Sequence, residues 1–471
     1  MNPFRRLATI TLVTNLIYIF WLFFTKSNPL FMFLESGIIL LNVIFIFNSR
    51  KRKYVLSGGP HSMRPIVDIF ITIKNEDAKL FEKTVKSAVG IFYPNKRIYV
   101  LDDGGREDVK KIADKYACTY LSRDDKEAKS YKAANLNYGL KHAFGNFILT
   151  LDADMQANPN ILDELLGFFN DNDKLGFVST RQGFDVDVND FNHENLFYEY
   201  MQAGKNSYGV GISCGSGVIY RRSALDKIGG FQEWNIVEDL YTSYVLNSNG
   251  YSSIYVSQSF THGDAPTDLA AIYKQRGLWA QDTLRLLIYK NPLFRKGLTF
   301  SKRLQYFEIG YSYIVSGLFF PMIYLMNIYS LVANDPIIIL GKEWYLLLRI
   351  PSFFISLQMF SNFSKGTSSM KMWAGLFPVY FKAFIKALLY KKPVYKVTPK
   401  GLKPRRSILL VLPQLTFLIA AVGAVIFHIF TYGLTWVFAI NTYWVCVMIY
   451  FMSGVVIKAF PKKKYEKNIN N

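Results

Sequence analysis

The chain has little cysteine and little charge, and both shortages exclude whole classes of protein. It holds three cysteines among 471 residues, at Cys118, Cys214 and Cys446, with no CxxC pair. Cysteines scattered in this way exclude a disulfide framework and a thiolate zinc site. Charged residues make up 19% of the chain, against a usual share of about a quarter. Because 51% of the residues are hydrophobic, intrinsic disorder is excluded as well.

The charge that is present is mostly positive. The chain carries 55 Lys and Arg against 35 Asp and Glu, a formal net charge of +20. Such a surplus favours either nucleic acid or an anionic membrane surface as a partner. The length corresponds to roughly three domains, and the position of the charges along the chain decides between the two partners.

Long apolar runs lie towards both ends of the chain. A membrane-spanning helix needs about 20 mostly apolar residues. The region between residues 48 and 308 contains no such run. We therefore predict six spanning helices, at 7–24, 30–47, 309–332, 344–360, 408–430 and 434–460.

The first run has an alternative interpretation as a cleaved signal peptide, because Arg5 and Arg6 precede it. Its apolar stretch is longer than the apolar core of a signal peptide, which has about 7–15 residues. No A-x-A cleavage motif follows it. A spanning helix is therefore the favoured interpretation.

Positive charge predicts how the spans are oriented, because Lys and Arg collect on the cytoplasmic side. The connections at 25–29, 333–343 and 431–433 are short and carry little charge. The opposite ends of the spans are basic, with Arg5-Arg6, Arg50 to Lys53, Lys302-Arg303, Lys391-Lys392, Arg405-Arg406 and Lys462 to Lys464. We expect a multi-pass plasma membrane protein whose termini and central region are cytoplasmic, and no nucleic acid partner.

Two further stretches are apolar but carry charge at helical spacing. The segment 370–390 has Lys382 and Lys386 four residues apart, and 270–287 is similar in character. We predict that each is a helix lying in the membrane interface. Arg349 falls inside the fourth span, where charge is costly. Either it faces the interior of the bundle, or the span starts later and Arg349 lies at its rim.

The central region has a different pattern from about Pro65 onward. Short runs rich in β-branched residues alternate with helical segments, which indicates βαβ units and a parallel sheet. Ligands bind at the carboxyl ends of the strands in such sheets. The expected strands are 67–73, 97–101 and 147–151, and the expected helices are 80–89 and 109–116.

Carboxylates follow two of these strands directly. Asp102 and Asp103 end one strand, and Asp152 and Asp154 end another. Two carboxylates at alternate positions are able to share Mg²⁺ or Mn²⁺, which takes oxygen ligands and accepts phosphate oxygens as well. A single D-x-D pair is weak evidence for a metal site, because surface loops often contain one.

A spaced motif follows the aspartates. Thirty-five residues separate Asp239 from Gln275, which begins the sequence Gln-Arg-Gly-Leu-Trp ending at Trp279. This series resembles the D, D, D, Q(Q/R)xRW signature of processive family 2 glycosyltransferases, which include cellulose, chitin, curdlan and hyaluronan synthases. Further segments resemble the cellulose synthase branch: Lys132 to Asn137 (KAGNLN), Asn75-Glu76 (PTYNE), Thr180 to Phe184 (TPQxF) and Tyr395 to Lys400 (the FxVTxK gating loop).

The resemblance covers about residues 1–460 and implies a fold. We expect an α/β GT-A-type nucleotide-sugar transferase domain inserted between transmembrane helices, with interfacial amphipathic helices. About ten residues follow the last span, so we expect no PilZ domain. The implied parts are two spans (1–50), the cytoplasmic transferase domain (51–268), interfacial helices with the Gln275 motif (269–305), two spans (306–364), an interfacial helix and gating loop (365–406), two spans (407–460) and a basic tail (461–471).

The resemblance also implies an activity. It is that of a processive, inverting hexosyltransferase that polymerises a UDP-sugar, by default UDP-glucose, into a β-glucan-type exopolysaccharide or capsule with Mg²⁺ or Mn²⁺. The growing polysaccharide is the acceptor and leaves through the enzyme's own six-helix channel. Three alternatives stay open: a hyaluronan-, chitin- or poly-GlcNAc-type synthase using UDP-GlcNAc, a non-processive enzyme adding single sugars to a lipid, and a transporter with an inactive transferase domain.

The matching positions carry implied roles. Asp239 is the general base, with Glu238 beside it, and Asp154 holds the cation with help from Asp152. The remaining residues fall into three groups: nucleotide-sugar binding (Asp102, Asp103, Lys132, Asp152, Gln275, Arg276 and Glu76), acceptor binding (Trp279, Cys214 and Gly215) and the gating loop (Tyr395, Val397, Thr398 and Lys400).

Three positions depart from the family pattern. Leu278 stands where the signature has arginine, so contact with the pyrophosphate is expected from Arg276 and Gln275. Ile73 replaces the threonine of PTYNE, and Tyr395 replaces the phenylalanine of the gating loop.

Structural alternatives remain for the main candidates. Asp239 could cap the helix expected from Leu240, and Asp103 could belong to an ordinary turn with Gly104. Trp279 could be an interfacial anchor. The gating-loop residues Thr398 and Lys400 could lie in a loop without ligand contact.

Overall fold

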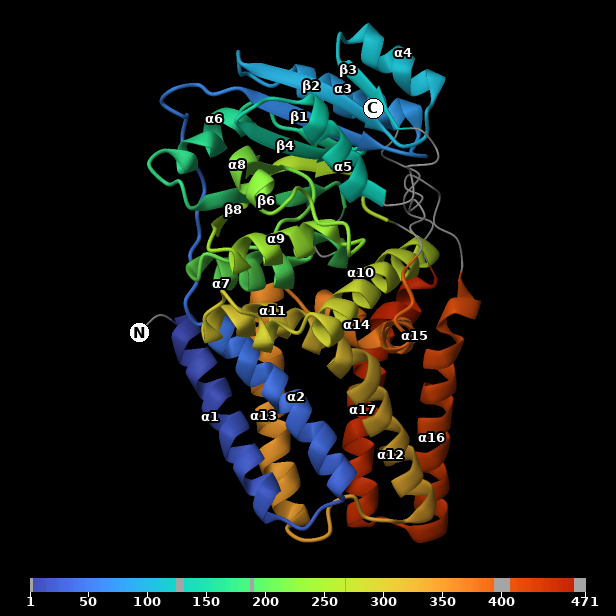
Figure 1. Ribbon diagram of the computed structural model, residues 1–471. Coiled ribbons are helices and arrows are strands. Elements are labelled where there is room, and N and C mark those ends of the chain that lie inside the picture. Colours follow the sequence, from blue (N-terminus) through green and yellow to red (C-terminus); the bar gives the residue numbers. More distant parts are fainter. Residues whose placement is uncertain (1–2, 124–130, 187–189, 267, 394–406, 461–471) are drawn as a thin grey trace.

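The computed structural model describes residues 3–123, 131–186, 190–266, 268–393 and 407–460. It consists of an α/β domain stacked on a bundle of long helices, with a layer of further helices between them (Figure 1). The first two long helices precede the domain in the chain, and the others follow it. The predicted insertion of the domain between helical segments is therefore confirmed.

Among the described residues, six helical segments are long and apolar enough to cross a membrane, as predicted. The third begins at Phe300, nine residues earlier than predicted, because the chain is already helical where it passes under the domain. The segments comprise α1 (Pro3–Phe24), α2 (Pro29–Ser49), α11 (Phe300–Ile314) with η6 (Val315–Phe319) and α12 (Phe320–Ala333), α13 (Lys342–Ser364), η7 (Ile408–Val411) with α16 (Leu412–Tyr432), and α17 (Trp436–Lys458).

The short connections between these helices meet at the end of the bundle away from the domain (Figure 1). The backbone N–H of Asn28 donates to Ile337 O at 2.8 Å, and that of Ile339 donates to Lys26 O at 2.7 Å. His428 Nδ1 lies 2.8 Å from Leu331 O. The start of α1 and the end of α17 therefore lie at the same end of the bundle as the domain.

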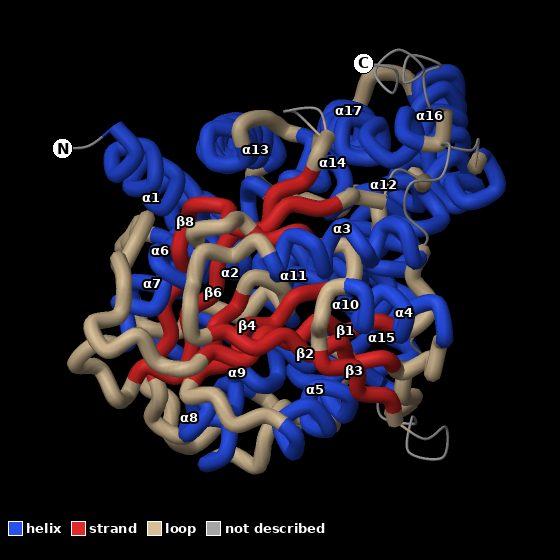
Figure 2. The backbone as a smooth tube through the Cα atoms, turned by 90° about the horizontal axis from the view of Figure 1, so that it is seen from above, coloured by secondary structure: helices blue, strands red, loops and turns tan. Residues whose placement is uncertain are grey.

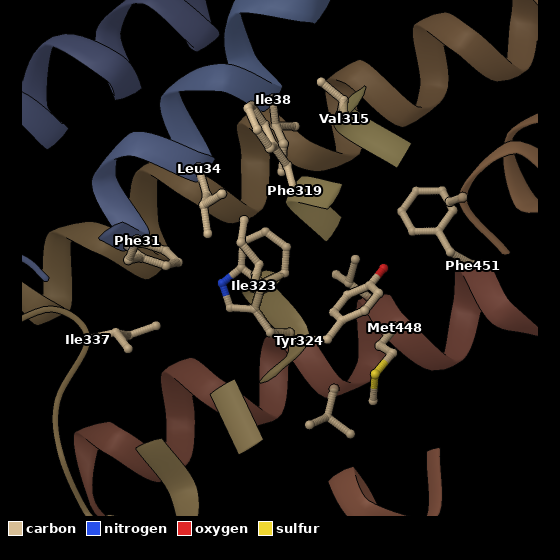
Figure 3. Packing of buried hydrophobic residues seen from close by; sticks show 14 of the residues in the cluster. Phe31, Leu34, Ile38, Val315, Phe319, Ile323, Tyr324, Ile337, Met448 and Phe451 are labelled. Carbon is tan, nitrogen blue, oxygen red and sulfur yellow. The ribbon is translucent and has the colours of Figure 1, made fainter. Parts of the chain in front are cut away.

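The bundle core is apolar and closely packed (Figure 3). Phe31, Leu34 and Ile38 of α2 pack with Phe319 and with residues of α12 and α17. Gly37 permits this contact, because a Cβ at its position would lie 2.2 Å from the Phe319 ring. Any larger residue there would separate α2 from the third segment.

Arg349 faces the interior of the bundle, so the rim alternative is wrong. Its side chain is 5% exposed and forms an ion pair with Glu35 of α2, which is fully buried. The guanidinium carbon also lies 5.5 Å from the centre of the Tyr18 ring and 5.4 Å from that of Trp444. A buried charge in a membrane-spanning segment is expected to have such a partner.

The domain is built on one eight-stranded sheet with strand order β3-β2-β1-β4-β7-β6-β8-β5. The three predicted strands are β2, β1 and β4, and they form a parallel part of the sheet together with β3, which was not predicted. The sheet as a whole is mixed, because β7 runs antiparallel to both β4 and β6. The strands are β1 (Val67–Ile73), β2 (Lys96–Asp102), β3 (Thr119–Ser122), β4 (Phe147–Asp152), β5 (Met155–Ala157), β6 (Leu175–Phe184), β7 (Val218–Arg221) and β8 (Ser252–Gly263).

Helices cover both faces of the sheet (Figure 2), which explains why every residue of β1 is buried. Val67, Ile69 and Ile71 pack towards α3, α4 and α6, whereas Phe70 packs towards α5, α8 and α9. The helices are α3 (Ala78–Val89), α4 (Glu107–Lys115), α5 (Tyr131–His142), α6 (Ile161–Leu165), η2 (Leu166–Phe169), η3 (Phe191–His193), η4 (Leu196–Met201), α7 (Gln202–Ser207), α8 (Arg222–Lys227) and α9 (Glu238–Ser248).

The layer between domain and bundle contains α10 (Leu269–Tyr289), η5 (Pro292–Phe294), α14 (Ser368–Gly375) and α15 (Phe377–Leu388). The single helix predicted over 370–390 is thus two helices, and that prediction was wrong. Pro378 lies in the first turn of α15, where a missing N–H is tolerated, whereas it would break a continuous helix. On α15, Lys382 and Lys386 are exposed while Tyr380 is buried.

Buried polar contacts join the domain to the bundle. Lys205 of α7 lies 3.0 Å from Glu308 Oε2 of α11, and both side chains are buried. Lys205 Nζ also donates to Gln305 O at 2.7 Å, and Asn48 Nδ2 of α2 donates to Glu308 Oε2 at 2.8 Å. The junction therefore contains a fully buried ion pair with additional hydrogen bonds.

Candidate active site

A cavity of about 370 Å³ lies between the carboxyl ends of β1 and β4, the start of α9, and α10. It brings together most of the residues that the sequence analysis selected from distant segments. These are Glu76, Asp103, Lys132, Asp152, Asp154, Cys214, Gly215, Glu238, Asp239, Gln275, Arg276 and Trp279. The gating-loop residues Tyr395, Val397, Thr398 and Lys400 lie outside the described residues.

Of the two aspartates that end β2 and begin the following turn, the second lines the cavity and the first does not. Asp102 is fully buried, and its carboxylate accepts hydrogen bonds from Gly104 N and Arg106 N, both at 2.7 Å, and from Tyr120 Oη at 2.9 Å. It therefore stabilises the turn after β2. The expected contact between Asp102 and the nucleotide does not fit this position.

Asp103 has one strong partner at the cavity wall. Arg123, at the end of β3, donates from Nε to Asp103 Oδ1 at 2.8 Å, and both side chains are buried. Burial raises the pKa of Asp103, and the Arg123 guanidinium opposes the rise. The sequence analysis missed Arg123, because it did not identify β3, the strand that Arg123 follows.

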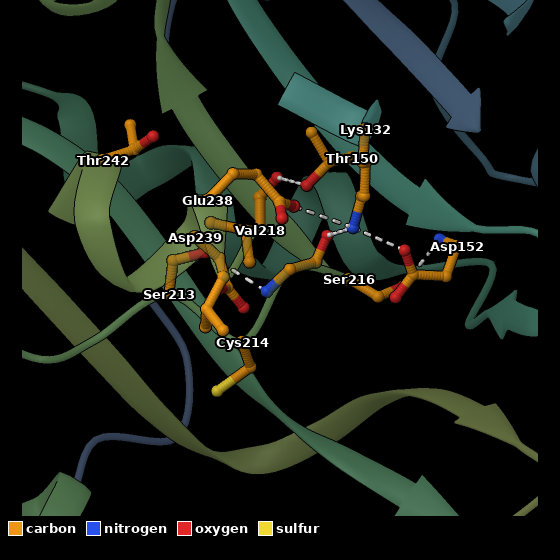
Figure 4. A network of polar contacts seen from close by, with 12 residues as sticks. Lys132, Thr150, Asp152, Ser213, Cys214, Ser216, Val218, Glu238, Asp239 and Thr242 are labelled. Carbon is orange, nitrogen blue, oxygen red and sulfur yellow. Dashed lines mark hydrogen bonds and ion pairs between the residues drawn. The ribbon is translucent and has the colours of Figure 1, made fainter. Parts of the chain in front are cut away.

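Lys132 of α5 connects three parts of the site (Figure 4). Its Nζ lies 2.5 Å from Asp152 Oδ1 at the end of β4, 3.2 Å from Glu238 Oε1 of α9, and 3.3 Å from Gly215 O. Burial disfavours the charged amine, but Asp152 and Glu238 outweigh this effect and hold the pKa of Lys132 well above its ordinary value. The amine therefore remains a fixed positive charge between carboxylates.

Asp239 lies in the first turn of α9, and the helix cap is Val237. Its Oδ1 accepts a hydrogen bond from the N–H of the next residue, Leu240, at 2.7 Å. Burial raises the pKa of Asp239 to about 7, Glu238 adds to the rise, and Lys132 opposes it. A carboxylate with a pKa near neutrality is suited to accept a proton at physiological pH.

A glycine turn leaves room for this carboxylate. Gly215 has φ +79°, and a Cβ at its position would lie 3.0 Å from Asp239 Oδ2. Burial raises the pKa of the thiol of the neighbouring Cys214 to about 12. Gln202 Nε2 contacts its Sγ at 3.4 Å. The turn thus shapes the cavity beside Asp239.

Arg276 and Trp279 lie on the α10 side of the cavity. Arg276 forms an ion pair with Glu194, and its guanidinium carbon lies 4.9 Å from the centre of the Trp279 ring. Glu194 has φ +47°, in the left-handed region that few non-glycine residues occupy. The charge of Arg276, expected to face the pyrophosphate, is thus balanced by a protein carboxylate that the sequence analysis did not identify.

The carboxylates of the cavity fit a divalent cation bound jointly with phosphate. Asp152 and Asp154 line the cavity. Burial raises the pKa of Glu76, and the negative charges of Asp154 and Asp152 add to the rise. Within the described residues no group of three or more His, Cys, Asp or Glu side chains is arranged to hold a metal ion. Oxygen ligands from a diphosphate would complete the coordination that these two aspartates leave open.

The chain is similar in sequence to known proteins. Residues 68–229 match the model of Glycosyl transferase family 2. The chain is 28% identical over 361 residues to the UDP-forming cellulose synthase 1 catalytic subunit of Komagataeibacter xylinus, covering 72% of this chain and 47% of that one. It is 29% identical over 325 residues to the corresponding UDP-forming subunit of Pseudomonas fluorescens, covering 64% and 44%. The matches thus span less than half the length of these two relatives.

A solved structure shares the fold. The mannosyltransferase PcManGT from Pyrobaculum calidifontis, in complex with GDP-Man and Mn²⁺, superposes with a TM-score of 0.57 at 16% identity, covering 77% of this chain and 99% of that one. The domain therefore has the predicted GT-A-like fold. Residues 68–229 therefore form a domain that matches glycosyltransferase family 2, and the chain is similar over 72% of its length to a bacterial cellulose synthase catalytic subunit.

Proposed function

We propose that the protein is a processive, inverting β-glycosyltransferase that polymerises a UDP-sugar and passes the product through its own helical bundle. One observation carries the proposal: Asp239, with its raised pKa, and Asp152 and Asp154, at the end of β4, line one cavity. A base for the acceptor and carboxylates for a cation-bound diphosphate are the two groups that sugar transfer from a nucleotide donor needs. UDP-glucose is the first candidate donor.

Negative charge develops on the diphosphate as its bond to the sugar breaks. Lys132 supplies fixed positive charge there, because its pKa stays well above neutrality. Asp154 and Asp152 would hold Mg²⁺ or Mn²⁺, which neutralises phosphate charge as a Lewis acid when bound. Asp103, oriented by Arg123, lines the cavity on the side where we place the nucleoside.

The attacking hydroxyl group of the acceptor must lose its proton. Asp239 accepts the proton of the acceptor hydroxyl as that oxygen attacks the sugar carbon. Attack from the face opposite the leaving diphosphate inverts the anomeric centre. The Trp279 side chain is partly exposed at the cavity wall, and offers a flat apolar surface to the terminal sugar of the acceptor.

A route for the product starts at this cavity. A second cavity of about 170 Å³ lies within the bundle, and its walls are mostly apolar side chains of several spans. Met201 and Trp373 line both cavities. We place the domain end of the bundle on the cytoplasmic side of the plasma membrane, because the basic residues flank the spans at that end.

The first test is the reaction itself. The purified protein in lipid nanodiscs, given UDP-glucose and Mg²⁺, is expected to release UDP and to form a polymer that a linkage-specific glucanase digests. EDTA should stop both, and added Mg²⁺ or Mn²⁺ should restore them. A parallel reaction with UDP-GlcNAc tests the runner-up donor. Release of UDP only with a lipid acceptor, with one sugar added, would contradict processive synthesis.

The pH dependence tests the role of Asp239. Because its pKa is raised to about 7, the rate should increase as pH rises through about 7, as the carboxyl loses its proton. Glu238→Gln removes the neighbouring charge that adds to this rise, so the acidic limb should move to lower pH. Glu107→Gln, exposed on α4, is the control. An unchanged limb in Glu238→Gln would assign the titration to another group.

A further inference from the structure

Three of the described residues that line the active-site cavity carry a positive charge, namely Lys74, Lys132 and Arg276. The charges of Lys132 and Arg276 are balanced, since each of these side chains forms an ion pair with a carboxylate of the cavity wall. Lys74 is half-buried. Within the described part of the chain, its ammonium group forms neither a hydrogen bond nor an ion pair. Of the three, Lys74 is therefore the one whose charge is available to a ligand.

The topology of the sheet places Lys74 in the middle of the site. Lys74 directly follows β1, which lies between β2 and β4. The register pairs the last residue of β1 with Asp102 and the residue before it with Asp152. Ligands bind at the carboxyl ends of such parallel strands. Lys74 therefore lies between Asp103, which follows β2, and the pair Asp152 and Asp154, which follows the end of β4.

The turn after β2 holds the backbone of Lys74 close to Asp103. The N–H of Asp103 donates to Ile73 O at 2.9 Å, and a Cβ at Gly104 would lie 2.5 Å from Lys74 O. Burial raises the pKa of Asp103, and the charges of Arg123 and Lys74 both oppose the rise. The ammonium group of Lys74 thus lies within electrostatic reach of Asp103 at the cavity wall.

A donor bound as proposed above extends along this edge of the sheet. Its nucleoside lies on the side of Asp103, and its sugar and the cation lie towards Asp154 and Asp239. The diphosphate joins the two and therefore passes the end of β1. Carboxylates outnumber positively charged groups among the described residues that line this cavity, so a diphosphate there needs further positive charge. Leu278, at the arginine position of the signature, lines the cavity without supplying any.

We propose that Lys74 binds the donor through an oxygen of the phosphate nearest the nucleoside. The proposal rests on the proposed function, because it presupposes a nucleoside diphosphate in this cavity. An ammonium group is a compact charge with three donors and is well suited to a phosphate oxygen. In the segment that resembles PTYNE, Lys74 occupies the tyrosine position. The charge is therefore a property of this chain and not of the motif.

The test compares ligands with and without phosphate. Titration calorimetry on the full-length protein in lipid nanodiscs, with Mg²⁺ present, measures the binding of UDP and of uridine. Lys74→Met should weaken UDP binding about tenfold and change uridine binding by less than about twofold, because a charge-assisted hydrogen bond to phosphate is lost. Lys74→Arg keeps the charge and should retain most of the UDP affinity. Lys79→Met, exposed on α3, removes the same charge and is the control.

Unchanged UDP binding in Lys74→Met, or an equal loss for UDP and uridine, would overturn the proposal. The same holds if Lys79→Met weakens UDP binding as much as Lys74→Met does, because the effect would then come from net charge alone. If Lys74→Met does not fold, Lys74→Gln is judged by the same criteria. A wild-type protein that binds no UDP in the presence of Mg²⁺ would instead refute the proposed function, so the two failures are distinguishable.

Discussion

Asp239→Asn is expected to lower the rate of sugar transfer by about 10²- to 10⁴-fold, the usual contribution of a general base. The substitution keeps the size of the side chain and removes its ability to accept a proton. It also removes one negative charge near Lys132 and Glu238, which leaves that ion pair in place. The variant should therefore remain folded and bind the donor.

The measurement is UDP release together with polymer formation, at a pH well above 7. Asp173→Asn is the matched control, because its side chain is fully exposed on the domain surface. Retention of the rate within about tenfold of wild type in Asp239→Asn would assign the base to another residue. Loss of UDP-sugar binding would indicate that Asp239 acts on the donor side instead.

The second large effect is expected on the stability of the helical bundle. Arg349→Met leaves the fully buried carboxylate of Glu35 without its partner, and breaking a buried pair in this way costs about 3–5 kcal/mol. The double variant Glu35→Met with Arg349→Met replaces both charged side chains by apolar ones. It should regain most of the free energy of unfolding that Arg349→Met loses. Thermal unfolding in detergent, followed for both variants, measures the difference.

An exposed ion pair serves as the control for the buried pair of Arg349 and Glu35. Lys365 lies 3.6 Å from Glu199 with its side chain 64% exposed, and such pairs contribute about 0–1 kcal/mol. Lys365→Met should therefore shift the unfolding temperature little. A double variant as unstable as Arg349→Met would show that the guanidinium contributes through the rings of Tyr18 and Trp444 rather than through Glu35.

Much of the architecture could be predicted because its causes are local. Six spans follow from the length of the apolar runs, and the parallel part of the sheet follows from runs such as Val67–Ile73. The break within the helix predicted over 370–390 could also have been predicted. Pro378 stands in the predicted segment, and a proline restricts where a helix is able to continue.

The distribution of roles within the site could not be predicted in the same way. Asp102 and Asp103 are adjacent, and which one lines the cavity depends on the turn through Gly104 and Gly105, where Gly105 has φ +61°. The partners Arg123 and Glu194 come from segments far from Asp103 and Arg276 in the chain. Such pairings arise from tertiary packing, which no spacing in the sequence records.

The buried contact of Lys205 with Glu308 restricts how the molecule is able to work. Sliding or rocking the domain against the bundle would separate two charges inside a medium that solvates neither of them. Under the proposed function, forward movement of the product by one sugar unit is therefore a task for small parts of the cavity walls, while the distance between catalysis and exit stays constant through each cycle.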